Sequence, residues 1–189
     1  MTRFMVFALG SFLLQLLATA VVHAQVGHGI TASKALVKPD APNVFLLMSD
    51  DVGFAMASTF GGPVPTPNFD RLAKAGVRYN RFHTTGICSP TRAALLTGRN
   101  HHHAGFGYLA DLPDDHPGYH AEIPSNMTSV AEMLKRAGYN TAMFGKTHNV
   151  KHEATSAAGP FDQWPTGQGF EYFFGLVGGD TDQYRPALY

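Results

Sequence analysis

The only cysteine of this 189-residue chain, Cys88, opens the segment CSPTRAALLTGR. Pro90 and Arg92 follow it closely, and the small apolar run after them is typical of a helix. A helix that begins here places free backbone N–H groups and the positive end of its dipole beside Cys88. Arg92 can reach back to the same position. This setting favours a thiolate, an oxygen nucleophile or a bound oxyanion. The plainer alternatives are a small buried cysteine and an arginine that pairs with a surface acid.

Two further pairs of polar residues end apolar segments. Asp50 and Asp51 close the run NVFLLMS, and adjacent carboxylates there indicate either a hard divalent cation or one N-cap and one surface acid. Lys146 and His148 are two residues apart on an extended segment, so their side chains point the same way. A fixed charge beside an imidazole suits anion binding with proton transfer, although Lys-x-His also occurs often by chance. The histidines at 101–103 are interpreted as loop residues rather than metal ligands.

Strands and helices alternate around these groups. Residues 43–51 form a continuous apolar run, which is typical of a strand buried on both faces. Residues 77–82 alternate like a short strand, and residues 140–148 read as another strand with a turn at Gly145. The alternation predicts an α/β fold with a largely parallel sheet flanked by helices on both faces. Ligands of such sheets bind beyond the carboxyl ends of the strands, where both polar pairs stand.

Three helices are expected between and after these strands. Their predicted boundary residues are Pro67 and Gly76, then Ser89 and Gly98, then Ser125 or Asn126 and Gly138. The polar, glycine- and proline-rich stretch 99–126 separates the second helix from the third. Loops of that length are often functional.

The first 24 residues are interpreted as a cleaved signal peptide. Arg3 precedes a long apolar stretch, and Val22-His23-Ala24 gives the small-x-small pattern of a cleavage site. An uncleaved membrane anchor is the alternative, which Gly10, Ser11 and Gln15 weaken. We therefore expect export to the periplasm or out of the cell, with no stable membrane insertion after cleavage. Residues 25–42 read as a linker, and the folded part is expected over 43–189.

Composition narrows the class of protein. Lys plus Arg and Asp plus Glu are 14 each, and the formal net charge of zero gives no indication of a nucleic-acid partner. A hydrophobic content of 44% with 15% charged residues is that of a globular chain. A single cysteine cannot form a disulfide within the chain. The thiol of an exported chain is therefore expected to be paired outside, reactive, chemically converted or simply buried.

Together, these segments resemble one family. CSPTRAALLTGR closely resembles the signature of the type I, formylglycine-dependent sulfatases of the alkaline-phosphatase superfamily. Asp50-Asp51 before it, Gly145-Lys146-x-His148 after it and the closing GFEYFFGLVGGDTDQY agree in order. The likeness runs from about Asn43 to the end. It implies an alkaline-phosphatase-like fold and an arylsulfatase-like sulfuric ester hydrolase acting on a small-molecule or glycan sulfate ester.

The resemblance also implies how the reaction runs. A formylglycine-generating enzyme would oxidise Cys88 to formylglycine, whose hydrated gem-diol attacks sulfur with one hydroxyl while the alcohol leaves. The second hydroxyl then loses its proton and sulfate is expelled. Arg92 would steady the formylglycine, Lys146 would hold sulfate oxygens, and His148 would contact the formylglycine hydroxyl. These positive groups would surround a sulfate whose charge grows as the ester bond breaks.

A divalent cation belongs to the same implied site. Asp50, Asp51 and residue 88, as formylglycine, would be its ligands, with Ca²⁺ expected in preference to Mg²⁺. The family places further ligands, an Asp followed by Asn or a similar residue, and a second histidine and lysine later in the chain. None of these is expected before Tyr189. We therefore expect the N-terminal part of a sulfatase catalytic domain, inactive and poorly soluble by itself.

Three functions stay open. Sulfate ester hydrolysis is the first, and phosphonate monoester or phosphodiester hydrolysis in the same superfamily is the second. A non-catalytic, truncated remnant whose Cys88 remains a thiol is the third. One local departure bears on the site itself, because Thr147 stands where the family usually has a bulky aromatic residue.

Overall fold

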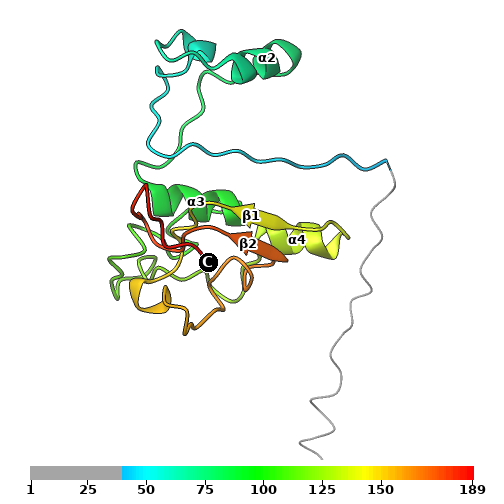
Figure 1. Cartoon of the computed structure of the whole chain (residues 1–189). Helices are drawn as coiled ribbons and strands as arrows, with labels where there is room; N and C mark the ends of the chain where they lie inside the picture. Colours follow the sequence, from blue (N-terminus) through cyan, green and yellow to red (C-terminus); the bar gives the residue numbers. More distant parts are fainter. Residues whose placement is uncertain (1–39) are drawn as a thin grey trace, which may run out of the picture. The chain divides into compact units, whose positions relative to one another are not determined.

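The structure is a computed structural model that describes residues 40–189 (Figure 1). The predicted signal peptide, residues 1–24, and residues 25–39 of the predicted linker lie outside the described part. Within residues 40–189, no helix has the length and apolar character needed to cross a membrane.

A short parallel sheet lies among helices and long irregular segments (Figure 1). In chain order the elements are η1 (Ser58–Phe60), α2 (Pro67–Ala75), α3 (Cys88–Thr97), α4 (Val130–Arg136), β1 (Ala142–Phe144), η2 (His152–Ala154) and β2 (Tyr172–Phe174). The two strands pair in parallel, with Ala142 opposite Tyr172 and Phe144 opposite Phe174. Gly145 follows β1 directly and has a φ of 94°, as the predicted turn requires.

Helix α3 begins at Cys88 itself. Its N-cap is Ile87, with an extended backbone and no side-chain capping bond, so the prediction of Ser89 as N-cap is wrong. The Ser89 hydroxyl is fully buried and instead accepts a hydrogen bond from the backbone N–H of Ala110 at 3.1 Å. Gly98 ends the helix in the left-handed conformation, φ 65°, which confirms the predicted terminator. Cys88 therefore lies in the first helical turn, where backbone N–H groups lack partners within the helix.

Helix α4 is capped by a different serine from those predicted. Ser129, rather than Ser125 or Asn126, is the N-cap, and its hydroxyl accepts a hydrogen bond from the Glu132 backbone N–H at 3.0 Å. Ser129-x-x-Glu132 is the sequence pattern of a capping box, a local signal that the assignment to residues 125–126 overlooked. Gly138 follows the helix with a φ of 101°, in agreement with the predicted end.

The strand predicted over residues 43–51 is absent, and that prediction is wrong. Val44, Phe45, Leu46 and Leu47 are between 62% and 86% exposed rather than buried. A strand needs a neighbour to pair its N–H and C=O groups, and in the described chain β1 and β2 pair only with each other. The short strand predicted over residues 77–82 is also absent, for the same reason.

Two buried clusters hold the segments around the site. One joins α3 to the long 99–126 loop; its members are Ala93, Ala104, Phe106, Ala110, Ala121 and Ile123. The other lies beyond β1; its members are Val150, Ala154, Trp164 and Val177. The first cluster buries Phe106 and Ala110 completely. The predicted loop is thus anchored in the core, and residues next to its anchors are held in place.

Candidate active site

Cys88 and His148 meet although 60 residues separate them along the chain. The Sγ atom of Cys88 lies 3.0 Å from Nδ1 of His148. Cys88 is partly exposed and is placed by the start of α3. His148 is 3% exposed, and its backbone N–H donates to the Val177 carbonyl at 3.1 Å, just past the pairing of β1 with β2. This hydrogen bond holds the backbone of His148 beside Val177, which follows β2, and the His148 imidazole contacts Cys88.

The other ring nitrogen of His148 has a partner that sequence reasoning missed. Asp111 Oδ2 lies 2.7 Å from His148 Nε2. Asp111 belongs to the 99–126 loop, and no motif surrounds it. The only available signal was an acid within a long loop, which does not single out one residue.

Asp50 connects the two basic residues of the site. Its Oδ1 accepts a hydrogen bond from Arg92 Nη2 at 3.0 Å, and its Oδ2 accepts one from Lys146 Nζ at 2.7 Å. Arg92 also donates from Nη1 to the backbone carbonyl of Lys146 at 2.5 Å. Burial opposes ionisation of Asp50, but the hydrogen bonds and positive charges of Lys146 and Arg92 outweigh it. The pKa of Asp50 is therefore below its ordinary value.

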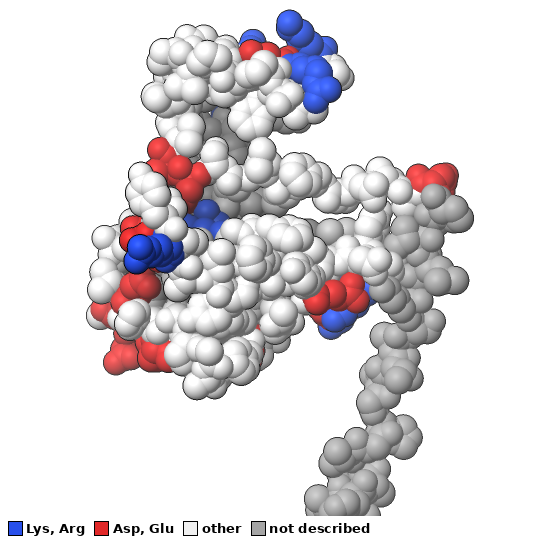
Figure 2. Space-filling model, in the orientation of Figure 1, with Lys and Arg blue, Asp and Glu red and all other residues white. Residues whose placement is uncertain are grey.

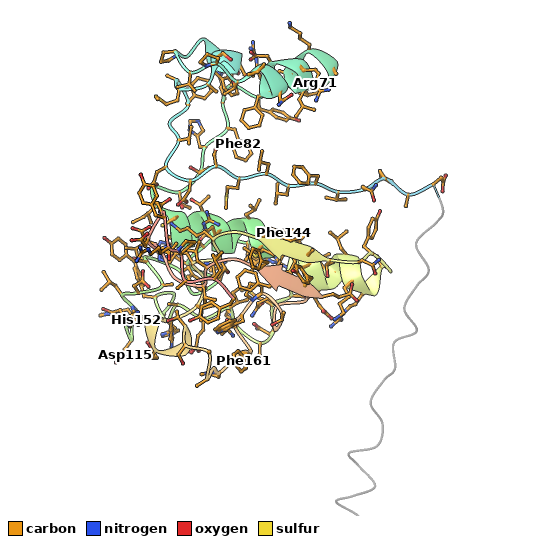
Figure 3. The ribbon with its side chains drawn as sticks, in the orientation of Figure 1. Arg71, Phe82, Asp115, Phe144, His152 and Phe161 are labelled. Carbon is orange, nitrogen blue, oxygen red and sulfur yellow. The ribbon has the colours of Figure 1, made fainter. Side chains whose placement is uncertain are left out.

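A pocket of about 720 Å³ brings most of the predicted residues together. Asp50, Asp51, Cys88, Lys146 and His148 all line it. Asp111, Gly178, Gly179 and His152 of η2, which is labelled in Figure 3, line it as well. Arg92 is buried and contacts Asp50 and Lys146 rather than lining the pocket. Acidic and basic side chains are interspersed on the face shown in Figure 2, in agreement with the balanced composition.

The described residues do not by themselves form a complete cation site. No three histidine, cysteine or acidic side chains within residues 40–189 are grouped so that they could hold one metal ion. Both carboxylate oxygens of Asp50 are engaged with Lys146 and Arg92, and Ca²⁺ needs six to eight oxygen ligands. The assignment of Asp50, Asp51 and residue 88 as metal ligands stays a prediction.

The histidines at 101–103 lie in a turn. His101 bonds through Nδ1 to the Phe106 carbonyl oxygen at 2.9 Å, and its ring lies 4.2 Å from that of His102. Both contacts tie these side chains to their own loop.

Comparison of the chain with known proteins identifies its family. Residues 42–189 match the Sulfatase family. The chain is 38% identical over 155 residues to an uncharacterised sulfatase of Schizosaccharomyces pombe, covering 77% of this chain and 26% of that protein. It is 35% identical over 152 residues to an arylsulfatase of Klebsiella aerogenes, covering 79% and 31%. It is 35% identical over 150 residues to human arylsulfatase A, covering 78% and 27%.

Solved structures agree. The PsFucS1 sulfatase from Pseudoalteromonas sp. superposes with a TM-score of 0.53 at 31% identity, covering 69% of this chain and 25% of that one. Ps i-CgsB superposes with a TM-score of 0.53 at 28% identity, covering 70% and 27%. These matches confirm the predicted alkaline-phosphatase-like α/β fold. The chain spans between 26% and 31% of the length of the three relatives named above. The match over residues 42–189, together with these relatives, shows that the chain belongs to the sulfatase family.

Proposed function

We propose that this protein serves as a sulfuric ester hydrolase, with residue 88 as its nucleophile after conversion to formylglycine. The observation that carries the proposal is the contact between Cys88 Sγ and His148 Nδ1 at the N-terminal end of α3. Lys146 lines the same pocket. Residue 88 as nucleophile, the His148 imidazole as proton acceptor and the Lys146 ammonium group as anion-binding group thus line one cavity.

The setting of Cys88 fits the formylglycine. The side chain opens on the pocket, stands in the first turn of a helix and touches an imidazole nitrogen. When present, the formylglycine supplies the hydroxyl that attacks sulfur. His148 Nδ1 lies within hydrogen-bond distance of residue 88, where it can hold or accept a proton. The proposal requires a formylglycine-generating enzyme that acts on this segment as a partner.

Lys146 and Arg92 would carry the electrostatic part of catalysis. Sulfate oxygens gain negative charge as the ester bond breaks, and a fixed cation at the pocket wall stabilises that charge. The Lys146 side chain is 14% exposed and is held by Asp50, so a bound sulfate would share or displace that carboxylate. Arg92 donates to the Lys146 carbonyl and adds a second positive charge beside Lys146.

We also propose that the site binds a divalent cation. Asp50 and Asp51 would supply two of its oxygen ligands and residue 88 a third, with Ca²⁺ in preference to Mg²⁺. Calorimetric titration with each ion, for the parent and for Asp51→Asn, measures this directly. Absence of any heat in the parent would remove the cation from the proposal.

The substrate class and location follow the family. A sulfate ester on a small molecule or a glycan is proposed, and one solved relative, Ps i-CgsB, was determined in complex with k-i-k-neocarrahexaose. Export through cleavage after Ala24 is also proposed. An N-terminal sequence of the mature protein that begins at Met1 would contradict it.

One experiment separates the proposal from its alternatives. The full-length gene product is made together with a formylglycine-generating enzyme, and its residue 88 is tested with a hydrazide and a maleimide. We expect hydrazide labelling of the Cys88 peptide, hydrolysis of an aryl sulfate in preference to an aryl phosphonate, and loss of both labelling and turnover in Cys88→Ala. A maleimide-reactive thiol without turnover would favour the non-catalytic remnant. Preferred hydrolysis of the phosphonate would favour the second hydrolase.

A further inference from the structure

We infer that Asp111 is a positioning residue that fixes the tautomer and orientation of His148, so that Nδ1 faces residue 88. The inference deepens the proposed function and rests on it, because it assigns a task to a residue that acts through His148. Its basis is the line of contacts from Asp111 Oδ2 to His148 Nε2, 2.7 Å, and from His148 Nδ1 to Cys88 Sγ, 3.0 Å.

The chemistry of the two nitrogens assigns the tautomer. An ionised carboxylate only accepts hydrogen bonds, so Asp111 requires the proton of a neutral imidazole to be on Nε2. Nδ1 then carries the lone pair and can accept a proton from the side chain at position 88. Without Asp111, the ring is free to carry its proton on Nδ1, where it can only donate. A histidine in that form cannot act as an acceptor at residue 88.

Ser89 is hydrogen-bonded to chain neighbours of both Asp111 and His148. Ser89, next to Cys88, accepts a hydrogen bond at its hydroxyl from the N–H of Ala110, next to Asp111, at 3.1 Å. Its carbonyl oxygen accepts one from Nδ2 of Asn149, next to His148, at 2.9 Å. Ser89 and Ala110 are fully buried, and Asn149 is 2% exposed. Hydrogen bonds therefore link chain positions next to Cys88, Asp111 and His148. These links limit how far the three side chains can move relative to one another.

A glycine packs against the contact between Asp111 and His148. An added Cβ at Gly179 would lie 2.5 Å from His148 Nε2 and 3.1 Å from Asp111 Oδ2. Real Cβ atoms essentially never lie as close as 2.5 Å to another atom, and 3.1 Å is also tight, so a side chain at 179 would displace the His148 ring or the Asp111 carboxylate. Gly86, which is exposed and does not line the pocket, has open space around its Cβ position. The two glycines make a matched pair for testing whether the contact matters.

The test reads the tautomer and the turnover separately. Full-length gene product carrying ¹⁵N-histidine is examined by long-range ¹H–¹⁵N NMR at neutral pH, with the His148 signals assigned by their loss in His148→Gln. We expect His148 to be protonated on Nε2 in the parent and to lose this preference in Asp111→Ala. In the converted enzyme, Asp111→Ala should lower kcat for an aryl sulfate at least about 10-fold and change KM less than about 2-fold. Asp115→Ala, an exposed loop acid labelled in Figure 3, is the matched control and should change neither.

The glycine pair keeps the inference testable if Asp111→Ala fails to fold. Gly179→Ala should reproduce the loss of the His148 preference and of kcat, and Gly86→Ala should not. Retention of the Nε2 tautomer and of kcat in Asp111→Ala, or in Gly179→Ala, would overturn the inference. If the parent enzyme hydrolyses no sulfate ester, the proposed function fails, while the NMR comparison still decides what Asp111 does to His148.

Discussion

Asp50 and Lys146 form an ion pair of 2.7 Å across 96 residues of sequence. Asp50 was predicted to bind a cation, and Lys146 was predicted to bind sulfate oxygens. In the structure these two side chains neutralise each other, so each ligand would compete with this ion pair. The pair lies at the pocket wall, with the Asp50 side chain 39% and the Lys146 side chain 14% exposed. Ligand binding and the stability of this region are therefore linked through a single carboxylate.

The first prediction concerns acid stability. The pKa of Asp50 is lowered in the folded protein, so its ion pairs stabilise the fold above the unfolded-state pKa of about 3.9. That stabilisation is lost as the pH falls through the lower, folded-state pKa. We expect the free energy of unfolding to fall less between pH 5 and pH about 2 in Asp50→Asn than in the parent. Urea unfolding across this range measures it, with Asp115→Asn as control. Equal slopes for the parent and Asp50→Asn would contradict the ion pairing.

The second prediction concerns competition for Asp50. If Asp50 and Asp51 bind Ca²⁺, the ion competes with the ammonium group of Lys146 for the Asp50 carboxylate. Lys146→Met should then tighten Ca²⁺ binding, and Asp51→Asn should weaken it. Isothermal titration calorimetry at low salt measures both, because salt screens the competing charges. An unchanged Ca²⁺ affinity in Lys146→Met would show that Lys146 and the cation do not share Asp50.

The third prediction concerns turnover. Lys146→Ala removes the ammonium group that would stabilise negative charge developing on the sulfate oxygens. We therefore expect kcat for an aryl sulfate to fall by about 100-fold or more. Lys151→Ala is the matched control, because that lysine pairs with Glu122 at 2.7 Å and does not line the pocket. Measurements of kcat and KM on both variants decide the matter. Comparable losses in the two variants would point to a general effect of charge rather than to a sulfate-binding role.

Side-chain chemistry predicted more of this protein than strand patterns did. Cys88, Lys146 and His148 could be selected from sequence by their residue types and spacing, and the structure places all three around one pocket. Their roles stay predictions. Asp111 could not, because its contact with His148 depends on a loop whose path is set by packing of Phe106 and Ala110. The sequence of a long irregular segment does not specify which of its residues contacts the His148 ring.

The errors at helix starts and strands have physical causes. Ser89 has the residue type of an N-cap, but its hydroxyl is used by the Ala110 N–H, and the helix starts one residue before it. The apolar run 43–51 has the composition of a buried strand, but an apolar run predicts burial and cannot supply the partner that a strand needs. Both cases were decided by contacts between segments distant in sequence.

The fourth prediction tests the cap that the sequence assignment missed. Ser129 is 1% exposed; its hydroxyl accepts from the Glu132 N–H at 3.0 Å and donates to the Gln168 carbonyl. Ser129→Ala removes the cap and leaves the partly buried Gln168 carbonyl without that donor, so we expect a loss of about 1 to 3 kcal/mol in the free energy of unfolding. Ser125 is exposed and outside the helix, so Ser125→Ala should change stability by less than about 0.5 kcal/mol. Urea unfolding of both variants measures the difference. A larger loss in Ser125→Ala than in Ser129→Ala would return the cap to the residue first predicted.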